Sequence, residues 1–131
     1  MIGTFGDIVF EASTQRIRTF DEYERQGEGR WAEHEVFGAK PRSQFLGAGL
    51  ETITFIMRFY HTFGVDIESE LERLRQWRDE GRVERFILGG RPQGFKNARW
   101  SILKLEEEVK FWDNNGMLLG VEATVTLKEY Y

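Results

Sequence analysis

The chain has 131 residues, no cysteine, and 18 basic against 22 acidic side chains, which gives a net charge of −4 at pH 7. Its length suits one soluble domain over residues 1–131, and the lack of cysteine excludes disulfides, thiolate metal sites and thiol catalysis. The acidic balance argues against a general nucleic-acid binder, and we expect neither a membrane span nor a secretion signal, because no window has the necessary apolar length.

Strand patterns dominate the first part of the sequence. Residues 5–12 are expected to form one strand, because alternate side chains are apolar. Residues 16–26 are heavily charged and alternate poorly, so they are expected to form either an edge strand or an exposed extension. Gly27 and Gly29 indicate a turn, after which residues 30–37 are expected to pair back as a hairpin.

Residues 37–49 are apolar and rich in glycine, and they lead directly into a strand. Gly38, Gly47 and Gly49 permit backbone conformations that other residues avoid, whereas Pro41 fixes its own φ. The segment is therefore expected to be extended and to carry the apolar side chains of Phe45 and Leu46. Those side chains need cover, either from a neighbouring subunit or from their own sheet, if the segment folds back as a wide hairpin connection.

The second half of the sequence gives clearer periodicities. Residues 51–60 alternate as a strand. Residues 66–81 have the apolar spacing of a helix that begins at Asp66 and stops at Gly81, and that should lie flat against a sheet. A short strand is expected over residues 85–88.

The last third of the chain predicts a long hairpin around the turn signal 113–116. The apolar side chains of its return strand are Leu119, Val121, Ala123, Val125 and Leu127. On the outgoing strand, Trp100 and Ile102 have the opposite parity from Leu103 and Leu105. This switch predicts either a bulge or a stretch that is buried on both sides.

Residues that could carry chemistry lack the partners that the chemistry needs. His34 and His61 have no metal-ligand spacing, so each is expected to be solvated or hydrogen-bonded. The acidic run 106–108 has no nucleophile or base beside it and is expected to be a solvated strand face. The loop 89–94 lacks the fingerprints of phosphate-binding loops. We therefore expect no enzyme, no cofactor and no metal.

A small basic patch is expected near the start of the last strand pair. It comprises Arg91, Lys96 and Arg99, with Phe95 and Trp100 between them. The patch could bind single-stranded nucleic acid, but it is short and the chain is acidic overall. A salt-bridged contact with an acidic neighbouring protein is the interpretation that we prefer.

An ordered set of motifs runs along essentially the whole chain. It comprises Gly6–Phe10, Arg30-Trp31, Gly38-x-x-Pro41-Arg42, Phe45-Leu46-Gly47-x-Gly49-Leu50-Glu51, Leu71-x-x-Leu74-Arg75, Gly81, Leu88-Gly89-Gly90 and Trp100, then an acidic stretch and a closing strand. In this order and at this length, the set resembles the GpU family of tail proteins from contractile bacteriophages.

The resemblance implies a structural part of a contractile phage tail or of a tail-like bacteriocin, assembled in the bacterial cytoplasm. The expected fold is α+β, an antiparallel β-sandwich or small barrel with one flanking α-helix, similar to tail-tube proteins. The expected role is a homo-oligomeric, sixfold baseplate ring that joins the tail tube to the spike hub and contacts other baseplate proteins. A terminator ring at the head-proximal end is the alternative, and a small ligand-binding β-barrel is the alternative from another class.

The resemblance also favours a neighbouring subunit, rather than the chain's own sheet, as the cover for the apolar segment 37–49. The candidate interface residues are Trp31, Pro41, Arg42, Phe45, Leu46, Gly47 and Gly49. In a tube ring, the carboxylates of 106–108 could instead form an acidic inner wall that repels DNA phosphates. A plain solvated strand remains the preferred interpretation of that run.

Overall fold

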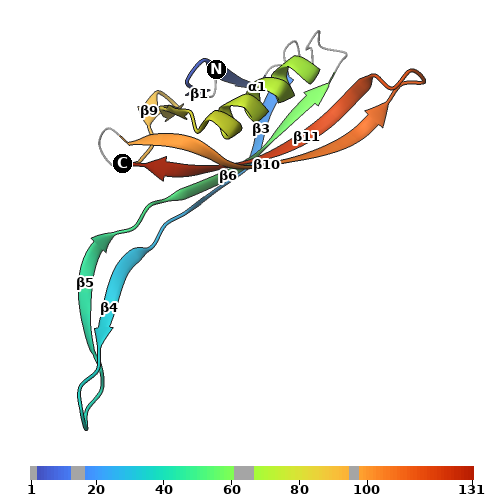
Figure 1. Cartoon of the computed structure of the whole chain (residues 1–131). Helices are drawn as coiled ribbons and strands as arrows, with labels where there is room; N and C mark the ends of the chain where they lie inside the picture. Colours follow the sequence, from blue (N-terminus) through green and yellow to red (C-terminus); the bar gives the residue numbers. More distant parts are fainter. Residues whose placement is uncertain (1–2, 13–16, 61–66, 95–97) are drawn as a thin grey trace.

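The computed structural model describes residues 3–12, 17–60, 67–94 and 98–131 (Figure 1). In chain order its elements are β1 (Gly3–Phe5), β2 (Ile8–Ala12), β3 (Ile17–Gln26), β4 (Gly29–His34), β5 (Arg42–Ala48), β6 (Thr52–Tyr60), α1 (Ile67–Glu80), β7 (Val83–Glu84), β8 (Phe86–Leu88), β9 (Arg91–Pro92), β10 (Arg99–Trp112) and β11 (Leu118–Tyr130). Residues 27–50, which contain β4 and β5, project as an arm, and we call the remaining described residues the body (Figure 1).

The strands of the body form a nine-stranded antiparallel sheet in the order β7-β10-β11-β6-β3-β2-β1-β8-β9. The helix α1 lies across one face of this sheet (Figure 1). This arrangement confirms the predicted α+β class and is sandwich-like, whereas the alternative of a small closed barrel is wrong. The strands at the two ends of the sheet, β7 and β9, have only two residues each, and Pro92 has no N–H to donate to a further strand.

The core lies between α1 and the sheet. Its buried side chains include Ile53, Phe55, Met57 and Phe59 of β6, Val121, Ala123, Val125 and Leu127 of β11, and Ile67, Leu71, Leu74 and Trp77 of α1. The alternating strand faces and the helical stripe therefore meet as the periodicities predict. Aromatic rings extend this core, because Phe5 packs edge to face on Trp77 at 5.6 Å and Phe55 stacks on Phe86 at 5.8 Å.

The helix α1 has the predicted end and is tied to β10 by an ion pair. Gly81 has a φ of +65°, the left-handed conformation that glycine adopts most easily at a helix C-terminus. The predicted first residue, Asp66, lies outside the described residues. The Arg75 guanidinium donates hydrogen bonds to both carboxylate oxygens of Glu107, with Nε–Oε1 at 2.9 Å. This contact ties α1 to β10.

The N-terminal part differs from the prediction in three respects. Residues 5–12 are not one strand, because Gly6, with a φ of +57°, and Asp7 form a turn between β1 and β2. Of the two alternatives for 16–26, the exposed extension is wrong, because β3 pairs with β6 from Thr19 to Gln26. The edge strand is largely right, since among the described residues β2 pairs with β3 only at Ile17 and Arg18. The predicted hairpin of residues 30–37 with that stretch is also wrong, because β4 pairs forward with β5.

The long C-terminal hairpin is confirmed, and the predicted parity switch is a bulge. The register shifts between Ile102 and Lys104, so Leu103 leaves the ladder and is exposed. A second irregularity near Phe111 brings Leu118, rather than Leu119, into the buried class. These bulges let Trp100 and Ile102 share the core face with the residues that follow them.

Candidate interaction site

The arm has one aromatic face. Trp31 of β4 lies opposite Phe45 of β5, and their rings contact edge to face with centroids 5.0 Å apart. Gly29 lies two residues before Trp31, and its missing side chain leaves room for the indole, whose Nε1 is 3.2 Å from an ideal Cβ there. Glu33 and Ser43 continue this face toward the tip of the arm. Trp31 is 62% exposed and Phe45 57% exposed, so neighbouring parts of the same chain leave both rings largely uncovered.

The opposite face of the arm is polar and makes its own hydrogen bonds. His34 Nε2 lies 2.7 Å from Gln44 Oε1, and the Arg30 guanidinium donates to the backbone carbonyls of Leu46 and Ala48. His34 is exposed, as predicted, and pairs with an amide. The arm is therefore amphipathic: Arg30, His34 and Gln44 of its polar face are hydrogen-bonded within the arm, and its aromatic face is uncovered.

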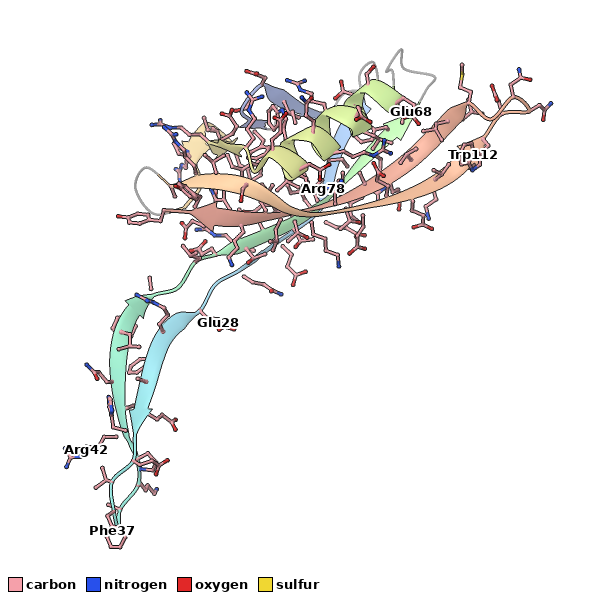
Figure 2. The ribbon with its side chains drawn as sticks, viewed as in Figure 1. Glu28, Phe37, Arg42, Glu68, Arg78 and Trp112 are labelled. Carbon is pink, nitrogen blue, oxygen red and sulfur yellow. The ribbon has the colours of Figure 1, made fainter. Side chains whose placement is uncertain are left out.

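The base of the arm is a tight crossing of two strands. The pair β3–β6 ends at Gln26 opposite Thr52, and the pair β4–β5 begins at Gly29 opposite Ala48. Between them, Gly49 N donates to the Glu28 carbonyl at 2.8 Å. The arm leaves the body at this point, with Glu28 near its base and Phe37 at its tip (Figure 2).

Polar contacts hold the strand that returns from the arm. Glu51 forms an ion pair with Arg25 of β3, and Arg25 NH1 also donates to Gln93 Oε1 at 3.1 Å. The hydrogen bond to Glu51 raises the pKa of the Arg25 guanidinium, and burial raises the pKa of the neighbouring Tyr23 hydroxyl. Glu51 O also accepts the Glu129 N–H at 2.9 Å. The base is therefore bonded to β3, to β11 and to the loop after β9.

The predicted interface residues all lie on the arm, but they do not form one surface. Trp31 and Phe45 make the aromatic face, and Leu46 occupies the bulge between the two registers, where it is 49% exposed. Gly47, with a φ of +123°, permits that bulge. Pro41 and Arg42 lie near the tip, and Arg42 is opposite His34 on the polar face (Figure 2). Gly49 lies at the base.

Two exposed apolar side chains of the arm, Phe37 and Leu50, are absent from the predicted list of interface residues, although Phe37 begins the segment that was expected to make the contact. Phe37 is fully exposed at the tip, and Leu50 is 51% exposed at the base. Correct pairing of residues 29–34 with residues 42–48 would have revealed them. A turn around Gly38 and Pro41 then places Phe37 at the end of a projecting hairpin.

The other predicted groups are dispersed. Glu107 faces α1 and pairs with Arg75, while Glu106 and Glu108 lie on the opposite face of β10 and pair with Lys104 and Lys110. The run is thus divided between two faces, and its outward carboxylates are neutralised by lysines.

The predicted basic patch does not present a stacking platform. Trp100 is fully buried, and its Nε1 donates to the Gln93 carbonyl at 3.0 Å. Phe95, Lys96 and His61 lie outside the described residues. Arg99 instead lines a cleft of about 360 Å³ between β1 and β7, together with Arg85.

Within the described residues, no group of three His, Asp or Glu side chains gathers as a metal site. No helix in the described part of the chain is long and apolar enough to cross a membrane.

The fold and the arm together define an α+β protein whose projecting arm carries the exposed aromatic side chains of Trp31, Phe37 and Phe45. Comparison with known proteins identifies its family. The sequence model of Phage P2 GpU matches residues 6–131, so the chain belongs to the Phage P2 GpU family, a family of phage tail structural proteins. This result confirms the resemblance noted in the sequence.

A curated relative adds a second, weaker link to phages. Over 111 residues, the chain is 26% identical to a protein of Halomonas phage phiHAP-1 named as a probable tape measure protein. The match covers 85% of this chain but only 12% of that protein. The similarity therefore concerns a small part of a much longer protein.

Proposed function

We propose that the protein is a structural, non-enzymatic subunit of a contractile phage tail or a tail-like bacteriocin. Copies of it form a sixfold ring at the baseplate end, where the ring joins the tail tube to the spike hub. Assembly takes place in the bacterial cytoplasm, and residues 1–131 act as one domain. Membership in a tail protein family supports the assignment to a tail particle. The baseplate position is our inference from the resemblance to contractile phage proteins.

The arm is the observation that carries this proposal. A two-stranded hairpin has marginal stability in water by itself, and this one leaves Trp31 and Phe45 uncovered. Large aromatic side chains that become buried at an interface are the usual anchors of binding energy. An arm of this kind is therefore suited to bury its aromatic face on another protein chain.

A ring requires a heterologous contact. The arm projects from one side of the molecule (Figure 1), and in the proposed ring it packs on a different surface of the next copy. Such a heterologous contact repeats from copy to copy, and it produces a closed ring when the rotation returns to the first copy.

The test replaces Phe45 and Leu46 together with serine. Both side chains are about half exposed, so we expect the midpoint of thermal unfolding to change little. Incorporation into particles, measured by immunoblot of purified tails, should be lost. Leu103→Ser is the matched control, because Leu103 is also 57% exposed but lies on the body. A large loss of thermal stability in the double variant, or normal incorporation, would contradict the proposal.

A further inference from the structure

Ion pairing on the body leaves a particular set of cations without a partner. Arg58 pairs with Glu122 at 3.1 Å, and Arg75 pairs with Glu107. By contrast, Arg85, Arg91, Arg99 and Lys128 make no ion pair with any described residue. Of these four, Arg99 and Lys128 lie together at the end of the β10–β11 pair. In a chain with a net charge of −4, exposed cations without carboxylate partners are candidates for an intermolecular contact.

These cations surround an exposed aromatic side chain. Arg99 lies directly opposite Tyr130 in the β10–β11 register, and Lys128 is two residues away on the same face. The alternate residues Trp100 and Glu129 are buried, so this face points away from the core. Tyr130 is 59% exposed. We call Arg99, Lys128 and Tyr130 the basic corner. The cleft that Arg99 lines also contains Arg85 and Glu84, and the Glu84 carboxylate pairs with Arg82 at 2.7 Å.

The aromatic face of the arm has the complementary composition. Trp31 and Phe45 supply two exposed rings, and Glu33 extends the same face with a carboxylate that has no partner among the described residues. Arg42 lies on the other face. The arm therefore presents aromatic rings next to a negative charge, and the basic corner presents an aromatic ring next to positive charges.

A second exposed aromatic surface on the body lacks this complementarity. Phe111, Trp112 and Met117 lie at the far end of the β10–β11 hairpin, where Trp112 is seen in Figure 2. The nearby Lys110 already pairs with Glu108 at 3.0 Å and with Glu122 at 3.8 Å. No uncommitted cation therefore lies there to meet Glu33, and charge favours the basic corner.

The arm and the basic corner of one copy cannot meet. Lys128 lies opposite Thr52, next to the base of the arm, and the arm runs away from the body from that base (Figure 1). A six-residue strand extends about 20 Å, which is long enough to cross onto an adjacent molecule.

We propose that the aromatic face of the arm docks on the basic corner of a second copy of this chain. Trp31 and Phe45 pack against Tyr130, and Glu33 pairs with Arg99 and Lys128. This contact rests on the proposed function and names the partner surface within the ring. Because the two surfaces differ, every copy donates one arm and receives another.

Cysteine cross-linking tests the contact directly, since the natural chain contains no cysteine. Ser43 lies opposite Glu33 on the aromatic face, and Ser101 lies opposite Lys128 beside the basic corner. In particles that carry Ser43→Cys with Ser101→Cys, mild oxidation should produce linked dimers and higher multimers on a non-reducing gel. Ser43→Cys with Asn114→Cys, which places the second thiol at the far hairpin turn, should give none.

A charge exchange supplies a second readout. Glu33→Arg should lower particle incorporation by about tenfold, because like charges then face each other. Combining it with Arg99→Glu and Lys128→Glu should restore incorporation.

The outcomes separate this contact from the proposed function. Suppose that the chain is present in particles and that the Phe45 and Leu46 variant is excluded from them. The contact alone is then overturned by any of three results: no Ser43–Ser101 link, a link to Asn114 instead, or no rescue by the charge exchange. If the chain is absent from particles, the proposed function and the contact both fail.

Discussion

At the scale of single residues, Gly49 sets how closely the two strands cross at the base of the arm. An ideal Cβ at Gly49 would lie 2.7 Å from the Glu28 carbonyl oxygen. The same carbonyl accepts the Gly49 N–H, so the backbones cannot separate without losing that hydrogen bond. The direction of the arm therefore depends on the absence of a side chain at this position.

Replacing Gly49 with alanine should redirect the arm while leaving the body folded. We expect incorporation into particles to fall several-fold or more, because small misplacements of an interface anchor remove its contacts. Far-ultraviolet circular dichroism should be unchanged. Ala48→Ser is the control, since it adds one atom at the exposed neighbouring residue. Normal incorporation of the Gly49 variant would show that the direction of the arm is unimportant.

Some properties of single residues could be predicted from the sequence, and others could not. Exposure of Phe45 and Leu46 was one of the two alternatives, because glycine and proline break the local pattern on either side of them. The pairing of Trp31 with Phe45 depends on a bulge at Leu46, which shifts the register by one residue. A bulge of this kind leaves no local mark in the order of apolar and polar residues.

At the scale of elements, α1 stabilises the body by covering one face of the sheet. Leu71 and Leu74 are 1% and 2% exposed. Burial of these two side chains therefore contributes on the order of a few kcal/mol to the free energy of unfolding. The Arg75–Glu107 ion pair adds a polar contact at the rim of this layer.

Leu71→Ala should destabilise the protein by about 2–5 kcal/mol, the usual cost of removing a buried leucine side chain together with the cavity that remains. Urea denaturation followed by circular dichroism measures this loss. Glu72→Ala, at the exposed neighbouring position, should change the free energy of unfolding by about 0.5 kcal/mol or less. Equal, small effects of both substitutions would be incompatible with a packed helix.

Elements with a strong local period were predicted, while their pairing partners often were not. The helix, β6 and the β10–β11 hairpin have regular patterns, and the structure contains all three. The charged stretch that forms β3 has no such pattern, because a bulge at Glu22, with a φ of +51°, interrupts its alternation. Its place in the sheet results from pairing with β6, which is distant in sequence.

At the scale of the whole molecule, the body and the arm have different physical roles. The body buries a continuous apolar core under α1, and the arm holds aromatic side chains away from that core (Figure 1). The family was predicted because its motifs are spread over the whole chain, and the match to residues 6–131 confirms it. The ring and its position in the tail remain proposals, because they depend on contacts between chains.

Cryo-electron microscopy of intact particles induced from the host tests the central claim most directly. The account predicts a sixfold ring of this chain next to the spike hub, with the aromatic face of each arm buried against a neighbouring chain. A ring at the head-proximal end would make the protein a terminator and contradict the baseplate position. Absence of the chain from intact particles, or arms that remain fully exposed to solvent, would contradict the role of the arm in assembly.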